Sequence, residues 1–202
     1  QTGDHATNFG KGTGPVHVED GAFLNQASQN DEMAFAFWIK NSDIAGNSAF
    51  WAYSPSSSSG GRGFQAHVPW SNNNIYFDTA GCCDAGTQRI NGNVGDFPGY
   101  SGEVTWWTDQ WHFLVFSKKA YHKLIWIDGA LFLEGSNTAP LPTDFTQLFI
   151  GAEKEATSLV HGLMDDFSVF GTALNEAKIN QLFSGTLPTA LPEKSAMVRY
   201  PF

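Results

Sequence analysis

Apolar and polar residues alternate along most of this chain, which is the pattern of β-strands that bury one face. Turns containing Gly, Asn, Asp or Ser separate these short segments, which are rich in Phe, Trp, Ile and Val. The predicted strands are 16–19, 33–40, 49–53, 63–68, 74–79, 111–117, 123–128, 131–134, 147–150 and 163–170. Residues 33–39 and 111–116 are apolar on both faces, so we expect them in central strands.

A helical pattern is found only near the end of the chain. After the strand at 163–170, Asn175 stands where an N-cap is expected, and Ile179, Leu182 and Phe183 fall on one helical face. The near absence of helical pattern before this point excludes an alternating β-α-β architecture. The sequence therefore predicts an all-β domain with one short C-terminal helix.

Several segments carry motifs that occur together in one family of β-sandwiches. They are 6–12 followed by 16–20, the strand at 35–40, the pair 111–116 and 123–129, the strand at 148–151, and the closing Gly-ϕ-ϕ-Asp-Asp-ϕ-x-ϕ-ϕ segment from Gly162. In this order they resemble the laminin-G-like domains of the concanavalin A-like lectin/glucanase jelly rolls. The resemblance implies a two-sheet antiparallel jelly-roll β-sandwich that serves as a binding module for glycans or proteins. Residues 53–106 do not match the family pattern.

The domain organisation is simple. Residues 1–185 are expected to form a single laminin-G-like domain, since one sandwich of this length is ordinary. Residues 186–202 contain Pro188, Pro192 and Pro201, so we expect a tail or a docked terminal strand there. Gln1 looks like the start of a processed chain or of a domain from a larger multidomain protein.

Charge and hydropathy narrow the range of partners. The net charge of −9 disfavours nucleic acid and anionic membranes. It also disfavours heavily sulfated glycans, unless a local cluster of arginines overrides the global field. No apolar run approaches the roughly 20 residues that span a bilayer, so we expect no membrane insertion. An aromatic content of 14% leaves rings available for an oligo- or polysaccharide ligand.

The two cysteines, Cys82 and Cys83, are adjacent. A disulfide between neighbours is possible only as a strained ring, because their Cα atoms are closer than in ordinary disulfides. The alternatives are two free thiols, which can simply fill space, or pairing with another chain. A secreted or cell-surface protein would favour the vicinal disulfide, which offers a rigid apolar plate to a sugar ring.

Candidate ligand contacts gather in the unmatched region. Loop aromatics can cover the C–H groups of a sugar while amide, carboxylate and guanidinium groups bind its hydroxyls. The candidates are Arg62, Trp70, Asn72, Cys82, Cys83, Asp84, Arg89, Tyr100 and Trp106. For any single aromatic the alternative is packing against the edge of the sandwich. Trp38, Trp111 and Trp126 lie in strand patterns and are expected in the core, whereas the position of Trp51 stays open.

A structural calcium ion is implied by the resemblance alone. Relatives of this type carry calcium near the closing strand and the opening segment, which points to Asp165 with Asp20 or a neighbouring carbonyl. The alternative is a turn cap or a surface ion pair. Asp165 and Asp166 should face opposite sides of the strand, so they are not expected to share a role.

No enzyme motif stands out. The Glu-x-Asp-x-x-Glu strand of retaining glucanases, the Arg-Glu-Arg and Gln-Ile/Val-His strands of alginate lyases, and His-based zinc motifs are all absent. We therefore expect a non-catalytic carbohydrate-binding module of a secreted or cell-surface protein. The alternatives are a protein-binding or adhesion module and, last, a polysaccharide-degrading enzyme with an unrecognised site.

Overall fold

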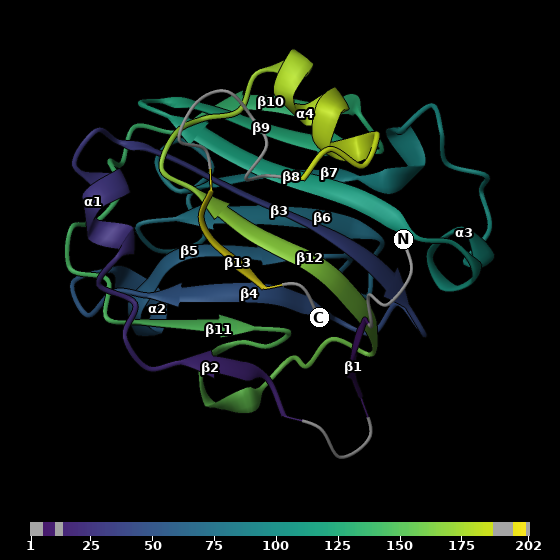
Figure 1. The fold of residues 1–202 in the computed structure, drawn as a ribbon, viewed down its shortest axis with the longest axis horizontal. Helices are drawn as coiled ribbons and strands as arrows, with labels where there is room; N and C mark the ends of the chain where they lie inside the picture. Colours follow the sequence, from purple (N-terminus) through teal and green to yellow (C-terminus); the bar gives the residue numbers. More distant parts are fainter. Residues whose placement is uncertain (1–5, 11–13, 188–195, 201–202) are drawn as a thin grey trace.

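The computed structural model describes residues 6–10, 14–187 and 196–200, which form two stacked antiparallel sheets (Figure 1). The seven-stranded sheet runs in the order β1 (Thr7–Phe9), β12 (Gly162–Phe170), β3 (Glu32–Asn41), β8 (His112–Lys119), β9 (His122–Ile127) and β10 (Ala130–Ser136), with β13 (Ala196–Tyr200) also pairing with β12. The six-stranded sheet runs in the order β2 (Val16–Val18), β11 (Gln147–Ile150), β4 (Ser48–Tyr53), β5 (Arg62–His67), β6 (Asn74–Thr79) and β7 (Arg89–Asn93). The predicted jelly-roll β-sandwich is confirmed.

Phenylalanine rings fill the space between the sheets. In β3, Phe35 and Phe37 point inward, and Phe35 stacks on Phe50 of β4 with ring centroids 4.3 Å apart. Phe37 stacks on Phe167 of β12 at 5.6 Å. These rings are fully buried, and burial of apolar area on this scale is the main force that holds two sheets face to face.

The C-terminal helix α4 (Glu176–Phe183) is present as predicted, with the Asn175 side chain accepting a hydrogen bond from the Lys178 backbone N–H. It packs on the outer face of the seven-stranded sheet, where Ile179 and Leu182 join a second apolar cluster with Trp126. Figure 1 shows α4 beside β9 and β10. No helix of the described residues is long and apolar enough to cross a membrane.

Several short elements were not predicted from the sequence. Three helices of one turn are α1 (Leu24–Ser28), α2 (Ser58–Gly61) and α3 (Thr105–Asp109), and two 3₁₀ turns are η1 (Val94–Asp96) and η2 (Lys154–Ala156). One turn is too short to display a helical period. The strand β7 was not expected either. The strand β1 lies in the segment 6–12 that resembles the opening strands of the family, and β13 lies in the tail, where a docked terminal strand was one alternative.

The tail is only partly described. Residues 196–200 form β13, which pairs antiparallel with the second half of β12. The segment that holds Pro188 and Pro192, and also Pro201, lies outside the described residues. The domain boundary at residue 185 stays a prediction.

The three tryptophans expected in the core differ in burial. Trp126 is buried as predicted, at 7% exposure. Trp38 is only half-buried, between Phe113 and Phe183. Trp111 is 37% exposed, so its prediction is wrong: it precedes β8, in the turn after α3, rather than in the strand.

One buried lysine joins the two sheets. Lys123 of β9 is fully buried, and its Nζ donates to the backbone oxygens of Phe77 and Gln88 at 2.9 and 3.0 Å. The same ammonium lies 2.9 Å from Asn137 Oδ1 and 3.2 Å from Thr79 Oγ1. Burial lowers the pKa of Lys123, while these oxygens provide its hydrogen-bond partners.

Candidate ligand-binding site

A continuous row of side chains crosses the outer face of the six-stranded sheet. In each strand the row residue alternates with inward-facing core residues such as Phe50, Phe64 and Phe77. The strand register places side by side His17 (β2), Phe149 (β11), Trp51 (β4), Gln65 (β5), Asp78 (β6) and Arg89 (β7). Strands lie about 4.8 Å apart, so this outer row spans about 24 Å.

The first half of the outer row is aromatic. The ring of His17 stacks on that of Phe149 with centroids 4.4 Å apart and an interplanar angle of 6°. The guanidinium carbon of Arg62 lies 4.8 Å from the centroid of the Trp51 ring. Phe149 and Trp51 are only 8% and 4% exposed, because the exposed ring of His17 covers the first and Arg62 covers the second. The exposed ring of this half is therefore that of His17, which suits the C–H face of a sugar or an apolar side chain.

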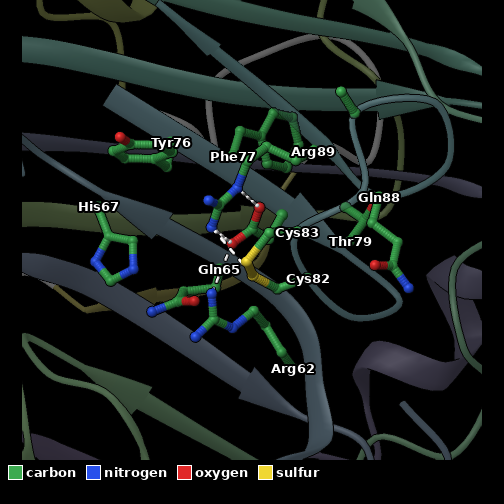
Figure 2. Close-up of polar contacts among 12 residues, drawn as sticks. Arg62, Gln65, His67, Tyr76, Phe77, Thr79, Cys82, Cys83, Gln88 and Arg89 are labelled. Atoms are coloured by element: carbon green, nitrogen blue, oxygen red, sulfur yellow. Dashed lines mark hydrogen bonds and ion pairs between the residues drawn. A yellow bond between two sulfur atoms is a disulfide. The ribbon is translucent and has the colours of Figure 1, made fainter. Parts of the chain in front are cut away.

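The second half is an ionic cluster around Asp78, whose side chain is 1% exposed. Arg89 donates from Nε and Nη2 to the two carboxylate oxygens of Asp78, both at 2.6 Å, and Arg62 Nη1 donates to Oδ2 at 2.8 Å. Figure 2 shows both guanidinium groups converging beside the disulfide. Charge-assisted bonds to one buried carboxylate hold the two arginines in fixed positions.

Cys82 and Cys83 form the vicinal disulfide with each other. Arg89 Nη2 lies 3.3 Å from Cys82 Sγ, and the hydroxyl of Ser59 donates to the Cys82 carbonyl at 2.9 Å. Cys82 is half-buried and Cys83 is exposed. The disulfide therefore forms one wall of the ionic cluster, on the solvent side.

Glu153, in the loop after β11, contacts several residues of the site. Its Oε1 accepts from Gln65 Nε2 at 3.0 Å, and lies 3.5 Å from His67 Nε2 and 3.9 Å from Arg62 Nη2. The same Gln65 Nε2 also donates to Ser48 Oγ at 2.9 Å. Burial, and next the positive charge of Arg62, lower the pKa of His67 to about 3, so this imidazole is neutral at neutral pH.

Four buried polar atoms of this face make no hydrogen bond with any part of the chain that the structure describes. They are Trp51 Nε1, Arg62 Nε, Gln65 Oε1 and His67 Nδ1. Leaving such an atom without a partner costs about 1–3 kcal/mol, and native proteins keep few of them. Four on neighbouring strands β4 and β5 mark a place where an incoming polar group would gain hydrogen bonds.

Other sequence-predicted residues flank this cluster. Trp70 is half-buried, and its ring lies 4.5 Å from that of His67. Asn72 Nδ2 donates to the Tyr76 hydroxyl at 2.9 Å. Asp84 is exposed and accepts hydrogen bonds from Gly86 and Thr87 in the turn that follows it. The hydrogen bond from the Thr87 hydroxyl is the main cause that lowers the pKa of Asp84.

Trp106 was predicted to be a loop aromatic that contacts the ligand, but it is buried, which is the alternative given for any single aromatic. It belongs to α3, is 4% exposed, and stacks on the His112 ring at 3.7 Å. The half-buried Tyr100 packs edge-on against Trp106 at 5.3 Å. The structure thus brings Arg62, Arg89 and Cys82 together around Asp78, whereas Trp70 lies beside His67 and Trp106 supports the core.

The two carboxylates predicted to bind calcium lie in or next to strands of different sheets. Asp20 follows β2 of the six-stranded sheet and accepts a hydrogen bond from Ala22 N–H, whereas Asp165 lies in the half of β12 that pairs with β1. No group of three or more His, Cys, Asp or Glu side chains that could hold a metal ion occurs among the described residues. Calcium stays a prediction, which a lower thermal midpoint after chelation would support.

Sequence reasoning missed Trp51, Gln65, His67, Asp78 and Glu153. A signal was present in the strand at 62–67, where Gln65 and His67 alternate with the apolar Phe64 and Ala66. Polar side chains at every second position of a strand share one face. What the pattern lacks is the register that sets them beside Asp78 and Trp51.

We expect His67 to make stability depend on pH. Its pKa falls from 6.5 to about 3 on folding, so the unfolded chain binds the proton more tightly, and stability decreases as the pH falls through this window. The expected loss is about 2 kcal/mol between pH 6.5 and about pH 5. Urea unfolding of the wild type and of His67→Asn measures it; equal slopes against pH in both proteins would contradict the assignment.

Comparison with known proteins agrees with this architecture. Residues 11–180 match the Laminin_G_3 family model, which describes the concanavalin A-like lectin/glucanases superfamily. A search of curated protein sequences found no match.

Solved structures share the fold at low sequence identity. The binding domain of botulinum neurotoxin DC in complex with rat synaptotagmin II superposes with a TM-score of 0.61 at 14% identity, covering 91% of this chain and 45% of that one. The same domain in complex with SialylT gives 0.53 at 16% identity, covering 79% and 36%. This chain therefore spans less than half the length of these structures. Because the family model covers most of its length, the chain belongs to the concanavalin A-like lectin/glucanases superfamily.

Proposed function

We propose that this chain is a non-catalytic carbohydrate-binding module of a secreted or cell-surface protein, and that its glycan lies along the outer row of the six-stranded sheet. The observation that carries the proposal is the set of four buried, unpartnered polar atoms on β4 and β5. Glycans carry many hydroxyl groups, which can donate and accept hydrogen bonds at such atoms.

The remainder of the row supports a chain-like ligand. The aromatic half and the ionic half are continuous across all six strands, over about 24 Å. A ligand of several sugar units that lies along this row would meet the exposed ring of His17, which stacks on Phe149, at one end and the polar cluster at the other. The disulfide of Cys82 and Cys83 supports an extracellular location, since such bonds persist in oxidising compartments.

A polypeptide is the alternative ligand, and a larger parent protein could supply further partners. The alternative draws support from the structural neighbour, whose binding domain was solved with synaptotagmin II. The two functions predict different results with purified glycans, since only a carbohydrate-binding module requires an oligosaccharide to bind without a partner protein.

A glycan array followed by calorimetry tests the proposal with a pair of tryptophan variants. Trp70→Ala removes the ring beside His67 and should weaken the binding of any glycan hit at least about tenfold, or 1.4 kcal/mol. Trp111→Ala removes an equally large, 37% exposed ring outside the site and should leave affinity unchanged.

Two outcomes would contradict the proposal. One is the absence of any saturable glycan binding while a protein partner binds with the Trp70 dependence. The other is equal loss of affinity in both variants, which would place the glycan elsewhere. Release of reducing or unsaturated ends from a polysaccharide would instead favour the enzyme alternative.

A further inference from the structure

We propose that the ionic half of the site selects an uncharged sugar unit over an acidic one that carries a carboxylate or sulfate. This inference rests on the proposed function and names its ligand class. It is carried by the hydrogen-bond types of the four unpartnered atoms and by the charges around them.

The free atoms are of mixed type. Trp51 Nε1 and Arg62 Nε are donors only, whereas Gln65 Oε1 is an acceptor only. The amide orientation of Gln65 is set by its neighbours, because its Nε2 faces the Glu153 carboxylate, which can only accept while it is ionised. The free atom of Gln65 is therefore an oxygen, which needs a donor from the ligand.

A hydroxyl group meets both requirements. It can accept from Arg62 or Trp51 and donate to Gln65 at the same time. An ionised carboxylate or sulfate has no proton to donate, so it would leave Gln65 Oε1 buried and unpaired. Sites with such buried polar atoms discriminate strongly against ligands that lack the matching group.

The charges of the cluster also oppose an anion. Both carboxylate oxygens of Asp78 accept hydrogen bonds from the arginines, and Arg89 uses its Nε and Nη2 for them. The Arg89 fork is therefore not free to hold a carboxylate in the two-point manner that arginine prefers. Formal charges balance, since Arg62 and Arg89 face Asp78 and Glu153, and the neighbouring His67 is neutral.

The carboxylate of Glu153 is the group that sets the preference for an uncharged sugar unit. It lies against Gln65, His67 and Arg62, the residues that carry three of the free atoms. A ligand anion placed on those atoms would meet a like charge in a half-buried setting, where screening is weak. Removing the charge of Glu153 should therefore relax the discrimination.

Matched glycan pairs test the inference by calorimetry. The probes are lactose against sialyllactose, and glucose oligomers against glucuronic acid oligomers of equal length. For the wild type we expect the neutral member of the binding pair to bind at least about tenfold more tightly. Tighter binding of the acidic member would overturn this inference and leave the proposed function standing. Absence of binding to either member of both pairs, and to every glycan of the array, would remove the proposed function and this inference together.

Two variants of one loop sharpen the result. Glu153→Gln keeps the shape but removes the charge, and should shift the neutral-to-acidic affinity ratio toward the acidic probe by about fivefold or more. Glu155→Gln makes the same charge change at a side chain that is 77% exposed, and should leave the ratio unchanged. Equal ratios in wild type and Glu153→Gln would overturn the role of Glu153, and both variants are checked for folding by circular dichroism.

Discussion

Replacing Lys123 by methionine is expected to lower the free energy of unfolding by at least about 3 kcal/mol. Methionine fills a similar volume, but it cannot donate to the carbonyls of Phe77 and Gln88 or to the Asn137 side chain. These oxygens would stay buried without their donor, and each such atom costs about 1–3 kcal/mol. These hydrogen bonds join β9 to β6 and to the loop before β7 across the sandwich, so the variant weakens the contact between the two sheets.

Lys119→Met is the matched control for this variant. Lys119 lies on β8, where its ammonium is 2.7 Å from Glu32 Oε1, but its side chain is 65% exposed. An exposed ion pair of this kind contributes less than about 1 kcal/mol. Urea unfolding of the wild type and the two variants at one pH measures the difference. Similar losses of unfolding free energy in both variants would show that the buried hydrogen bonds of Lys123 contribute no more than an exposed ion pair.

The fold could be predicted because its signals are local. Alternation of apolar residues located ten of the strands, and β6 and β11 have the predicted bounds. The helix α4 carried both an N-cap, Asn175, and an apolar face. The order of the motifs along the chain then matched one family, and the fold of that family specifies which strands pair.

The site could be predicted only in part, because its geometry depends on strand register. Arg62 and Arg89 were predicted as isolated charges. Asp78, the carboxylate that orients both, was not predicted, because it lies within a strand segment with no motif of its own. Trp51 and Phe149 become neighbours only through the pairing of β4 with β11, residues nearly a hundred positions apart. A single sequence carries no record of such pairings.

Trp106 illustrates a different limit. Its neighbours suggested a loop, and a loop aromatic is a reasonable ligand contact. The five-residue helix α3 instead turns this ring inward onto His112, which is held by Asp128 at 2.7 Å and by the Trp106 carbonyl at 2.6 Å. A helix of one turn has no period to detect, so burial on it cannot be inferred from pattern alone.

Asp78→Ala is expected to destabilise the protein by about 3–5 kcal/mol, the usual result when one partner of a buried ionic cluster is removed. The side chains of Arg62 and Arg89 are only 14% and 16% exposed, so solvent cannot replace the lost carboxylate. Glu153 is no substitute, because its nearest oxygen is 3.9 Å from Arg62 Nη2. Chemical denaturation at neutral pH measures the effect.

A second substitution tests whether the cost comes from uncompensated charge rather than from a cavity. In the double variant Asp78→Ala, Arg89→Met, one of the two stranded positive charges is gone, so stability should rise above that of Asp78→Ala alone. A cavity would behave in the opposite way, because removing a second large side chain would add to the loss. Additive losses in the double-mutant cycle would therefore contradict the ionic cluster as the element that organises the outer row. If the double variant is more stable than Asp78→Ala alone, the result would support a site in which the buried carboxylate of Asp78 holds both arginines in place before any ligand binds.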